Sequence, residues 1–290
     1  MKKVGSTTDT ADANGEYTNG NVANGISPTI INAEMLNTFQ RELIAVVEGA
    51  GINLDPANDS QVVEAIKIIA SGGRLVNVKA LTSSSVYVKP DSVKFVIADL
   101  IGGGGAGGSP AQNGVGFTSG SGGGNSGCHA RVLIDMREVD TVDFTIGEGG
   151  TAVAGNNGGT GGVTSFGDFA SVFGGNGGQI LASSNILNRI YGMSPLRDSY
   201  GSVNSALLLD FDFGHLGGDA IILSSGARAG FGGASAFGGN VFGPGNDSAG
   251  INATTYGGGG SGVVATNASF GTNLLGGNGA KGVIFIEEYA

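Results

Sequence analysis

The distribution of glycine along this chain of 290 residues limits what the chain can fold into. Of the 58 glycines, 50 follow Ile101, in runs such as 102–105, 122–124 and 257–260, whereas the first 101 residues hold only eight. Glycine loses more conformational freedom on folding than any other residue. The part after Ile101 must therefore either stay disordered or order its backbone by an unusual packing.

This glycine-rich part also carries apolar residues, in which disordered chains are poor. Aliphatic runs such as Val132-Leu133-Ile134 and Ile221-Ile222-Leu223 lie between the glycine stretches, so we expect a folded region. Collagen is excluded because the glycines keep no strict three-residue period and only six prolines exist. The favoured interpretation is a stack of polyglycine-II-type extended helices that bond laterally. Flexible linkers are the alternative.

Two short amphipathic helices are predicted before this region. Asn32 is a candidate N-cap for the first, and glycines at 49, 51, 72 and 73 supply the stops. Such helices bury too little apolar area alone, so we expect them to pack on each other and on neighbouring copies. The apolar positions at helical spacing, predicted to serve oligomerisation or attachment, are Leu36, Phe39, Leu43, Val47, Val62, Ile66 and Ile69.

From Leu75 the apolar period changes to two, which predicts β-strands. The strand candidates are 75–80, 86–88, 93–97, 129–136, 142–146, 162–166, 220–224 and 282–287. The expected fold class is mixed, with a short N-terminal α-helical attachment region followed by a β-rich, glycine-rich domain. The expected division is an extended arm over 1–31, two helices over 32–73 and the glycine-rich domain over 74–290, with 185–212 as an inserted subdomain or a trimer contact.

Charge and hydropathy exclude several classes of partner. The net charge is −10 and no basic cluster appears, so nucleic acid is not an expected partner. The same acidity disfavours anionic membrane surfaces. Membrane insertion is not expected, because no apolar stretch reaches the ~18 residues that a spanning helix needs. Polar residues follow the basic start of the chain, so a standard secretion signal is not indicated.

The glycine run Gly103-x-Gly105-x-x-Gly108 formally matches a dinucleotide fingerprint. That motif needs a helix N-terminus directly after it and an acidic residue about 20 positions later. Here no helical period follows, and no acid appears until Asp135. We therefore expect no cofactor.

Asp210, Asp212 and His215 lie close together in sequence and could bind a divalent cation. An edge strand that turns its polar residues outward is the favoured interpretation. Cys128 is the only cysteine, which rules out an intrachain disulfide, and we expect a structural role for it. We expect no catalytic or metal-binding residues and no enzyme activity.

The segments 36–43, 46–52 and 58–66 together resemble the N-terminal region of tailed-phage and prophage tail-fibre proteins. In that family, a phrase like Leu-Asn-x-x-Gln-x-Glu-Leu leads into a turn ending in Gly-Ile, and a second helix carries Gln-Leu-x-x-Ala-Ile. This chain has valine in place of that last leucine, at Val62. The segments 87–95, 144–150, 161–167 and 279–289 are similar to the glycine-rich domain of phage tail proteins.

This resemblance implies a virion protein, assembled in the host cytoplasm and usually a homotrimer, that docks on a tail or baseplate protein by its N-terminal part. The glycine-rich part would then recognise a host receptor, either a glycan or an outer-membrane protein. The loops 188–200 and 231–256 are the candidate binding loops, because aromatic faces suit both sugar rings and protein pockets. The predicted receptor contacts are Tyr191, Arg197, Tyr200, Phe237, Phe242 and Tyr256.

Three alternatives remain open from the sequence. The glycine-rich part could be a structural spacer, with another protein binding the host. It could be a polysaccharide-degrading tail spike, in which Asp210 and Asp212 would matter. A glycine-rich matrix protein is disfavoured by the missing signal sequence. The sequence does not distinguish a phage from a tailocin or a related injection device.

Overall fold

A computed structural model describes residues 2–111, 115–185, 189–192, 195–223, 225–266 and 273–290. The chain divides into two compact units, Met1–Arg74 and Leu75–Ala290, called the first and second unit below. Strands make up 28% of the chain and helices 12%, with the helices before the strands. The predicted mixed, β-rich fold class is confirmed.

The first unit contains helix α1 (Ala33–Gly49) and helix α2 (Gln61–Ser71), which pack on each other. Asn32 caps α1 as predicted, since its side chain accepts a hydrogen bond from the Met35 N–H at 3.1 Å. The helix ends before Gly51, whose φ of 75° lies in the left-handed region that glycine enters without strain.

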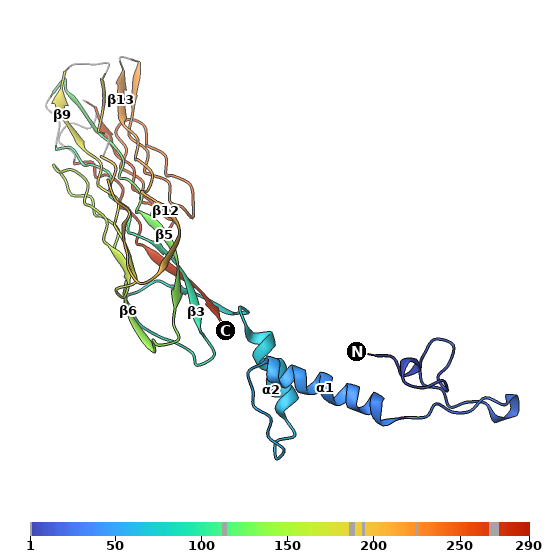
Figure 1. Ribbon diagram of the computed structural model, residues 1–290. Coiled ribbons are helices and arrows are strands. Elements are labelled where there is room, and N and C mark those ends of the chain that lie inside the picture. Colours follow the sequence, from blue (N-terminus) through green and yellow to red (C-terminus); the bar gives the residue numbers. More distant parts are fainter. Residues whose placement is uncertain (1, 112–114, 186–188, 193–194, 224, 267–272) are drawn as a thin grey trace. The chain divides into compact units, whose positions relative to one another are not determined.

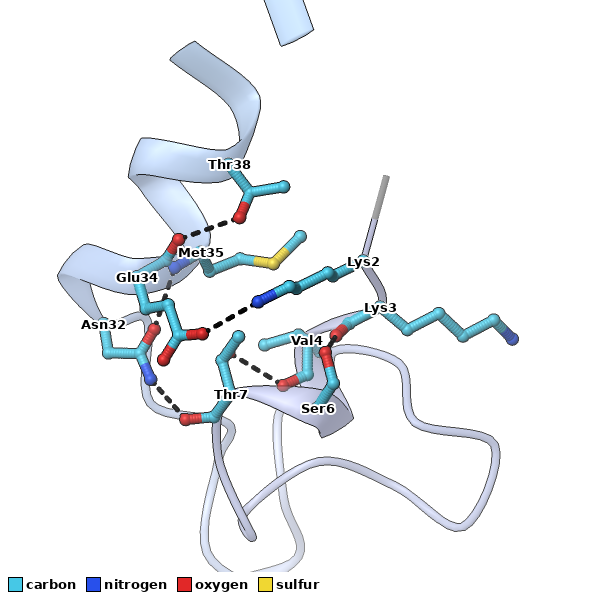
Figure 2. Close-up of polar contacts among 9 residues, drawn as sticks. All are labelled: Lys2, Lys3, Val4, Ser6, Thr7, Asn32, Glu34, Met35 and Thr38. Carbon is cyan, nitrogen blue, oxygen red and sulfur yellow. Dashed lines mark hydrogen bonds and ion pairs between the residues drawn. The ribbon is translucent and has the colours of Figure 1, made fainter. Parts of the chain in front are cut away.

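The chain before α1 folds back onto the N-terminus of that helix (Figure 2). Asn32 Nδ2 donates a hydrogen bond to the Thr7 carbonyl at 2.5 Å, while the same side chain caps α1. Val4 and Met35 are both buried at this junction. The segment also contains two 3-10 turns, Val4–Ser6 and Val22–Asn24. Residues 2–31 therefore carry local structure where the sequence led us to expect an extended arm over 1–31.

The second unit has two antiparallel five-stranded sheets at one end. One has the order β1-β16-β3-β5-β12, with bounds Leu75–Leu81, Val283–Tyr289, Phe95–Ile101, His129–Asp135 and Leu207–Asp212. The other has the order β11-β8-β7-β6-β2, with bounds Gly201–Val203, Ala170–Val172, Thr164–Phe166, Thr141–Thr145 and Ser85–Val88.

The described residues of the second unit also form two three-stranded sheets. The first, β10-β13-β14, spans Arg189–Tyr191, Ala220–Leu223 and Gly226–Arg228. The second, β15-β4-β9, spans Val264–Ala265, Thr118–Ser121 and Ile180–Ser184. Figure 1 shows β9 and β13 at the end of the unit opposite to β3 and β6. We call the end that carries β13 the tip.

The main hydrophobic core lies between the two five-stranded sheets. Alternate residues of β3 and β5 point into it, including the fully buried Leu100 and Val132. The facing sheet contributes Phe144 and Phe166, and the Phe166 ring lies 5.6 Å from that of Tyr87 between centroids. Period-two patterning in the sequence therefore corresponds to a β-sandwich with one shared core.

Glu288 of β16 is an ionisable group buried at the edge of this core. Its Oε1 accepts hydrogen bonds from Lys79 Nζ of β1 and from the Tyr87 hydroxyl of β2, both at 2.7 Å. Burial alone would raise the pKa of Glu288, but hydrogen bonds from Lys79, Tyr87 and Asn77 outweigh it and hold the pKa below its usual value. This carboxylate therefore links both sheets in its charged form.

The lowered pKa of Glu288 predicts a loss of stability in acid. A carboxyl whose folded pKa is below its unfolded value stabilises the fold above the unfolded pKa, and this contribution disappears as the pH falls through the folded pKa. We expect the melting temperature of Glu288→Gln to depend less on pH below about pH 4.5 than that of the wild type. Calorimetry between about pH 2.5 and 7 measures this, and parallel curves for the two proteins would contradict it.

Between the two ends of the second unit, glycine-rich segments run side by side (Figure 1). Along residues 103–108, successive N–H groups donate to three different neighbours, over distances of 2.8 to 3.1 Å. The partners repeat every three residues: 103 and 106 donate to segment 159–162, 104 and 107 to 277–280, and 105 and 108 to 122–125. Three residues per turn is the period of a polyproline-type helix. The polyglycine-II interpretation is confirmed for this segment.

The neighbouring segment 122–128 follows the same rule. Residues 122, 125 and 128 donate to segment 173–179, residues 123 and 126 to 215–218, and residues 124 and 127 to 257–260. It also accepts hydrogen bonds from the 102–108 segment, at 122, 125 and 128. Each of these two glycine helices thus donates to three neighbouring segments, and its backbone N–H groups find partners without a ladder of strands.

Glycine is required here because the neighbouring backbones approach so closely. A Cβ atom added at Gly104 would lie 1.9 Å from the Gly258 carbonyl oxygen, and one added at Gly122 would lie 1.7 Å from that of Gly192. Neither glycine has a positive φ, so the requirement comes from contact between helices and not from the local conformation. The glycine content is therefore a packing requirement, as in collagen, although the arrangement differs.

The described residues of the range 185–212 are integrated into the sheets of the second unit. They supply β10 of the tip and one edge strand to each five-stranded sheet, β11 beside β8 and β12 beside β5. The interpretation as an inserted subdomain is therefore replaced by integration into the sandwich. A trimer contact through these edge strands stays a prediction.

Candidate functional site

The β10-β13-β14 sheet at the tip has one buried and one exposed face. Ala220 and Ile222 of β13 are both buried, and Ala220 packs with Ala229 and Val264. On the other face, Ile221 lies opposite Ile190 of β10 and opposite Arg228 of β14. This register row places two aliphatic side chains and one guanidinium side by side on the surface, with Ile190 62% exposed.

Two phenylalanines extend this row into a groove. Phe231 lies against the bare backbone of Gly218, where an added Cβ would come within 2.4 Å of the ring. Phe242 is 68% exposed, the most exposed phenylalanine among the described residues. The groove, called the tip groove below, has a volume of about 620 Å³ and is lined by Ile190, Leu216, Gly217, Gly218, Asp219, Ile221, Arg228, Ala229, Phe231, Asn240 and Phe242.

The chemistry of this tip groove suits binding. Most of its lining is aliphatic or aromatic, and its polar groups are Asp219, Arg228 and Asn240. The described lining residues include no histidine, cysteine, serine or tyrosine. An apolar groove with a few polar groups at fixed positions is the usual form of a recognition site.

The predicted receptor contacts do not lie together. Phe242 lines the tip groove, and the backbone of Tyr191 belongs to β10, but the Tyr191 side chain falls outside the described part of the structure. Phe237 and Tyr256 instead surround Phe285 of β16, with ring centroids 5.0 and 6.5 Å from it. They therefore lie on the outer face of the sandwich.

Tyr200 and Arg197 have partners that account for their positions. The Tyr200 ring lies 4.9 Å from that of Phe211 and packs against the main core. The Arg197 guanidinium lies over the Phe173 ring at 5.4 Å, and its Nε donates to the Gly174 carbonyl at 3.1 Å. Both side chains therefore support the framework, and their role as receptor contacts stays a prediction.

A charged network covers the outer face of the sandwich beside Phe237. His129 Nε2 contacts the Asp99 carboxylate, and Arg131 bridges Asp99 at 3.5 Å and Glu287 at 2.9 Å. These pairs join neighbouring strands β3, β5 and β16. Because each contact joins side chains of different strands, the network holds these strands together.

The predicted oligomerisation positions are mostly exposed in the first unit. Val47 is buried and Val62 is half-buried, whereas the others have exposed side chains: Leu36, Phe39, Leu43, Ile66 and Ile69. Their predicted role in oligomerisation or attachment stays a prediction, and exposed apolar surface of this kind is consistent with it. No helix among the described residues is both long and apolar enough to cross a membrane.

Residues 80–287 match a protein family described as a glycine-rich domain. The match covers most of the chain. It includes the central strands of both five-stranded sheets and the glycine helices. The chain belongs to the glycine-rich domain family. No curated protein matches it.

The glycine-rich domain also accounts for the two motifs that resemble ligand sites. Gly103, Gly105 and Gly108 of the dinucleotide-like run donate their N–H groups to other glycine segments, so these donors are not free for a phosphate. Asp212 accepts a hydrogen bond from the Gly214 N–H at 2.8 Å, and Asp210 lies opposite Arg131. Within the described residues, no group of three or more acidic, histidine or cysteine side chains could hold a metal ion.

The sequence did not reveal Ile190, Ile221 and Arg228 of the tip groove. The available signal was the run Ala220-Ile221-Ile222-Leu223, which is apolar on both faces of a strand. Such a strand is either covered on both sides or exposes one apolar face. The glycine-rich domain leaves one face of β13 exposed at its tip.

Cys128 of the glycine-rich domain is buried, and its Sγ donates to the Phe213 carbonyl at 3.2 Å. Burial raises the pKa of the Cys128 thiol to about 11, with a further rise from Asp212 and an opposing effect of Arg197. The reactive thiolate is therefore rare at pH 8. We expect a disulfide reagent such as DTNB to label the folded protein at least ~100-fold more slowly than the protein in denaturant. Equal labelling rates would show that Cys128 is accessible in the folded state.

Proposed function

We propose that this protein is a tail-fibre or receptor-binding protein of a phage or a related injection particle. Its first unit attaches to the tail or baseplate, and its glycine-rich domain adsorbs to a receptor on the host surface. It assembles as a homotrimer and is part of the released particle. It has no catalytic role.

The observation that carries this proposal is the position of the tip groove. Leu75, where the chain enters the glycine-rich domain, pairs with Tyr289 next to the C-terminus, and Figure 1 shows that end opposite to β13. A bonded bundle of glycine helices separates the two ends. A rigid scaffold that presents an exposed apolar groove far from its own point of attachment suits adsorption to a surface.

Two further lines support the proposal. The motifs in the first unit and in the glycine-rich domain resemble those of phage tail fibres, and they follow in the order found there. The family to which the chain belongs is typical of such fibres. The receptor is a glycan or an outer-membrane protein, and the apolar lining of the groove favours a protein surface.

The test is adsorption of the purified full-length chain to a panel of bacterial strains. We expect saturable binding to strains that the parent particle infects, and competition with that particle for adsorption. A chain that neither binds nor competes would be a structural spacer. Release of reducing ends from surface polysaccharide would instead identify a degrading tail spike.

A further inference from the structure

The first unit has an apolar groove between α1 and the loop that leads into α2. Its volume is about 340 Å³. The apolar part of the lining comes from Leu43, Ile44, Val47, Leu54 and Val62. Two carboxylates, Asp55 and Asp59, also line it, and we call it the acidic groove.

Hydrogen bonds within the first unit hold the loop that forms one wall of this groove. The buried Gln61 side chain donates to the Asn53 carbonyl at 2.8 Å and accepts from the Asp55 N–H at 3.1 Å. Asp55 Oδ1 also accepts from the Ala57 N–H at 2.9 Å. The acidic groove is therefore formed before any partner arrives, which lowers the entropy cost of binding.

A second hollow, of opposite charge, lies at the C-terminal end of α2. It has a volume of about 560 Å³ and is lined by Ile66, Lys67, Ile68, Ala70 and Arg74. Lys67 and Arg74 form no ion pair with any residue that the structure describes. We call this surface the basic face.

The first unit leaves much of its apolar surface open. Among its described residues, the buried apolar side chains are Val4, Met35, Val47 and Ala65. Leu43 beside the acidic groove is 52% exposed, and Ile66 of the basic face is 55% exposed. A unit of this size with so small a core needs further burial to be stable. A partner that covers both surfaces would supply it.

We infer that the acidic groove packs against the basic face of a second copy of this chain. In this contact, apolar residues of one α2 cover Leu43 and Leu54 of the next copy, and Lys67 and Arg74 face Asp55 and Asp59. The two surfaces are complementary in both apolar character and charge, which fixes the pairing. Contacts between unlike surfaces, joined head to tail, close into a ring when the rotation from one copy to the next closes. The inference rests on the proposed function, a homotrimer, in that three copies complete this ring.

Charge reversal in the full-length chain tests this contact. We expect wild-type chain to be oligomeric by light scattering, and either Asp55→Lys with Asp59→Lys or Lys67→Glu with Arg74→Glu to raise the dissociation constant at least tenfold. Combining all four substitutions restores opposite charges across the contact, so association should return. Asp91→Lys with Asp140→Lys, exposed acids of the second unit, is the matched control and should leave the mass unchanged.

Circular dichroism shows whether each variant keeps its helices, so that misfolding is not mistaken for dissociation. A monomeric wild-type chain, an unchanged mass in both double variants, or a quadruple variant that stays dissociated would each overturn the inference. A monomer that binds a tail protein through Asp55 and Asp59 would assign the acidic groove to that protein instead. Adsorption to cells is measured separately, so failure of the contact and failure of the proposed function are distinguishable.

Discussion

Replacing Gly104 by alanine should prevent the second unit from folding cooperatively. Gly104 lies inside the bundle of glycine helices, where its N–H donates to the Ala280 carbonyl and its carbonyl accepts from the Gly150 N–H, both at 2.8 Å. The new Cβ would lie 1.9 Å from the Gly258 carbonyl oxygen. That contact is with backbone, so relief requires one helix to move and its hydrogen bonds to lengthen.

The expected cost exceeds the usual penalty for overpacking a core, which is ~1–3 kcal/mol. We expect more than ~4 kcal/mol, a large part of the ~5–15 kcal/mol that stabilises a typical domain. Calorimetry of the purified variant, or its accumulation as insoluble protein, measures the effect. Gly245→Ala is the matched control, because nothing lies within 4 Å of a Cβ added there. If both variants melt like the wild type, close helix packing does not hold this unit together.

Truncating Phe242 should weaken adsorption to the host more than any other single change that leaves the fold intact. Phe242 is 68% exposed and lines the tip groove beside Phe231 and Ile221. Exposed aromatic side chains at the centre of an interface commonly contribute ~2 kcal/mol or more to binding. We therefore expect Phe242→Ala to raise the dissociation constant for cells at least about 30-fold.

Two further variants show whether this loss is local. Phe242→Leu keeps an apolar side chain in the groove and should lose less affinity than the alanine variant. Phe237→Ala is the matched control, because Phe237 is also exposed but lies against Phe285 on the sandwich. A large loss from Phe237→Ala with none from Phe242→Ala would place the receptor site on the outer face of the sandwich.

Much of the fold follows from local signals in the sequence. Asn32 and the glycines near residue 50 set the limits of α1, and alternation predicted the strands that became β1, β3, β5 and β16. Each of these elements buries one face, so the spacing of apolar residues within the element itself indicates its secondary structure. The glycine runs also predicted polyglycine-II-type helices, which have a three-residue period. Glycine indicates this packing because only backbones without side chains can bond laterally at such short distances.

Other strands form only because strands distant in sequence pair with them, and the local sequence does not indicate that pairing. β4 reads Thr-Ser-Gly-Ser, with no apolar alternation, and it is a strand because β9 and β15 pair with it. β12 carries a bulge between Leu208 and Asp210, which interrupts its alternation. In both cases tertiary pairing decides the conformation.

The candidate site shows the same division. Phe242 could be selected from the sequence as an aromatic residue in a glycine-rich loop, and it lines the tip groove. The row of Ile190, Ile221 and Arg228 could not, because it exists only through the register of three strands distant in sequence. Tyr200 was selected on residue type alone, but its ring packs against the main core.

Hydrogen exchange at residues 103–108 tests the central claim most directly. If these glycines form helices bonded to three neighbours each, their N–H groups should exchange as slowly as those of strands β3 and β5, because opening one helix breaks bonds to all of its neighbours. Exchange at the rate of an unstructured peptide, while β3 and β5 stay protected, would contradict it. The glycines would then be flexible linkers, with no rigid scaffold to carry the tip groove.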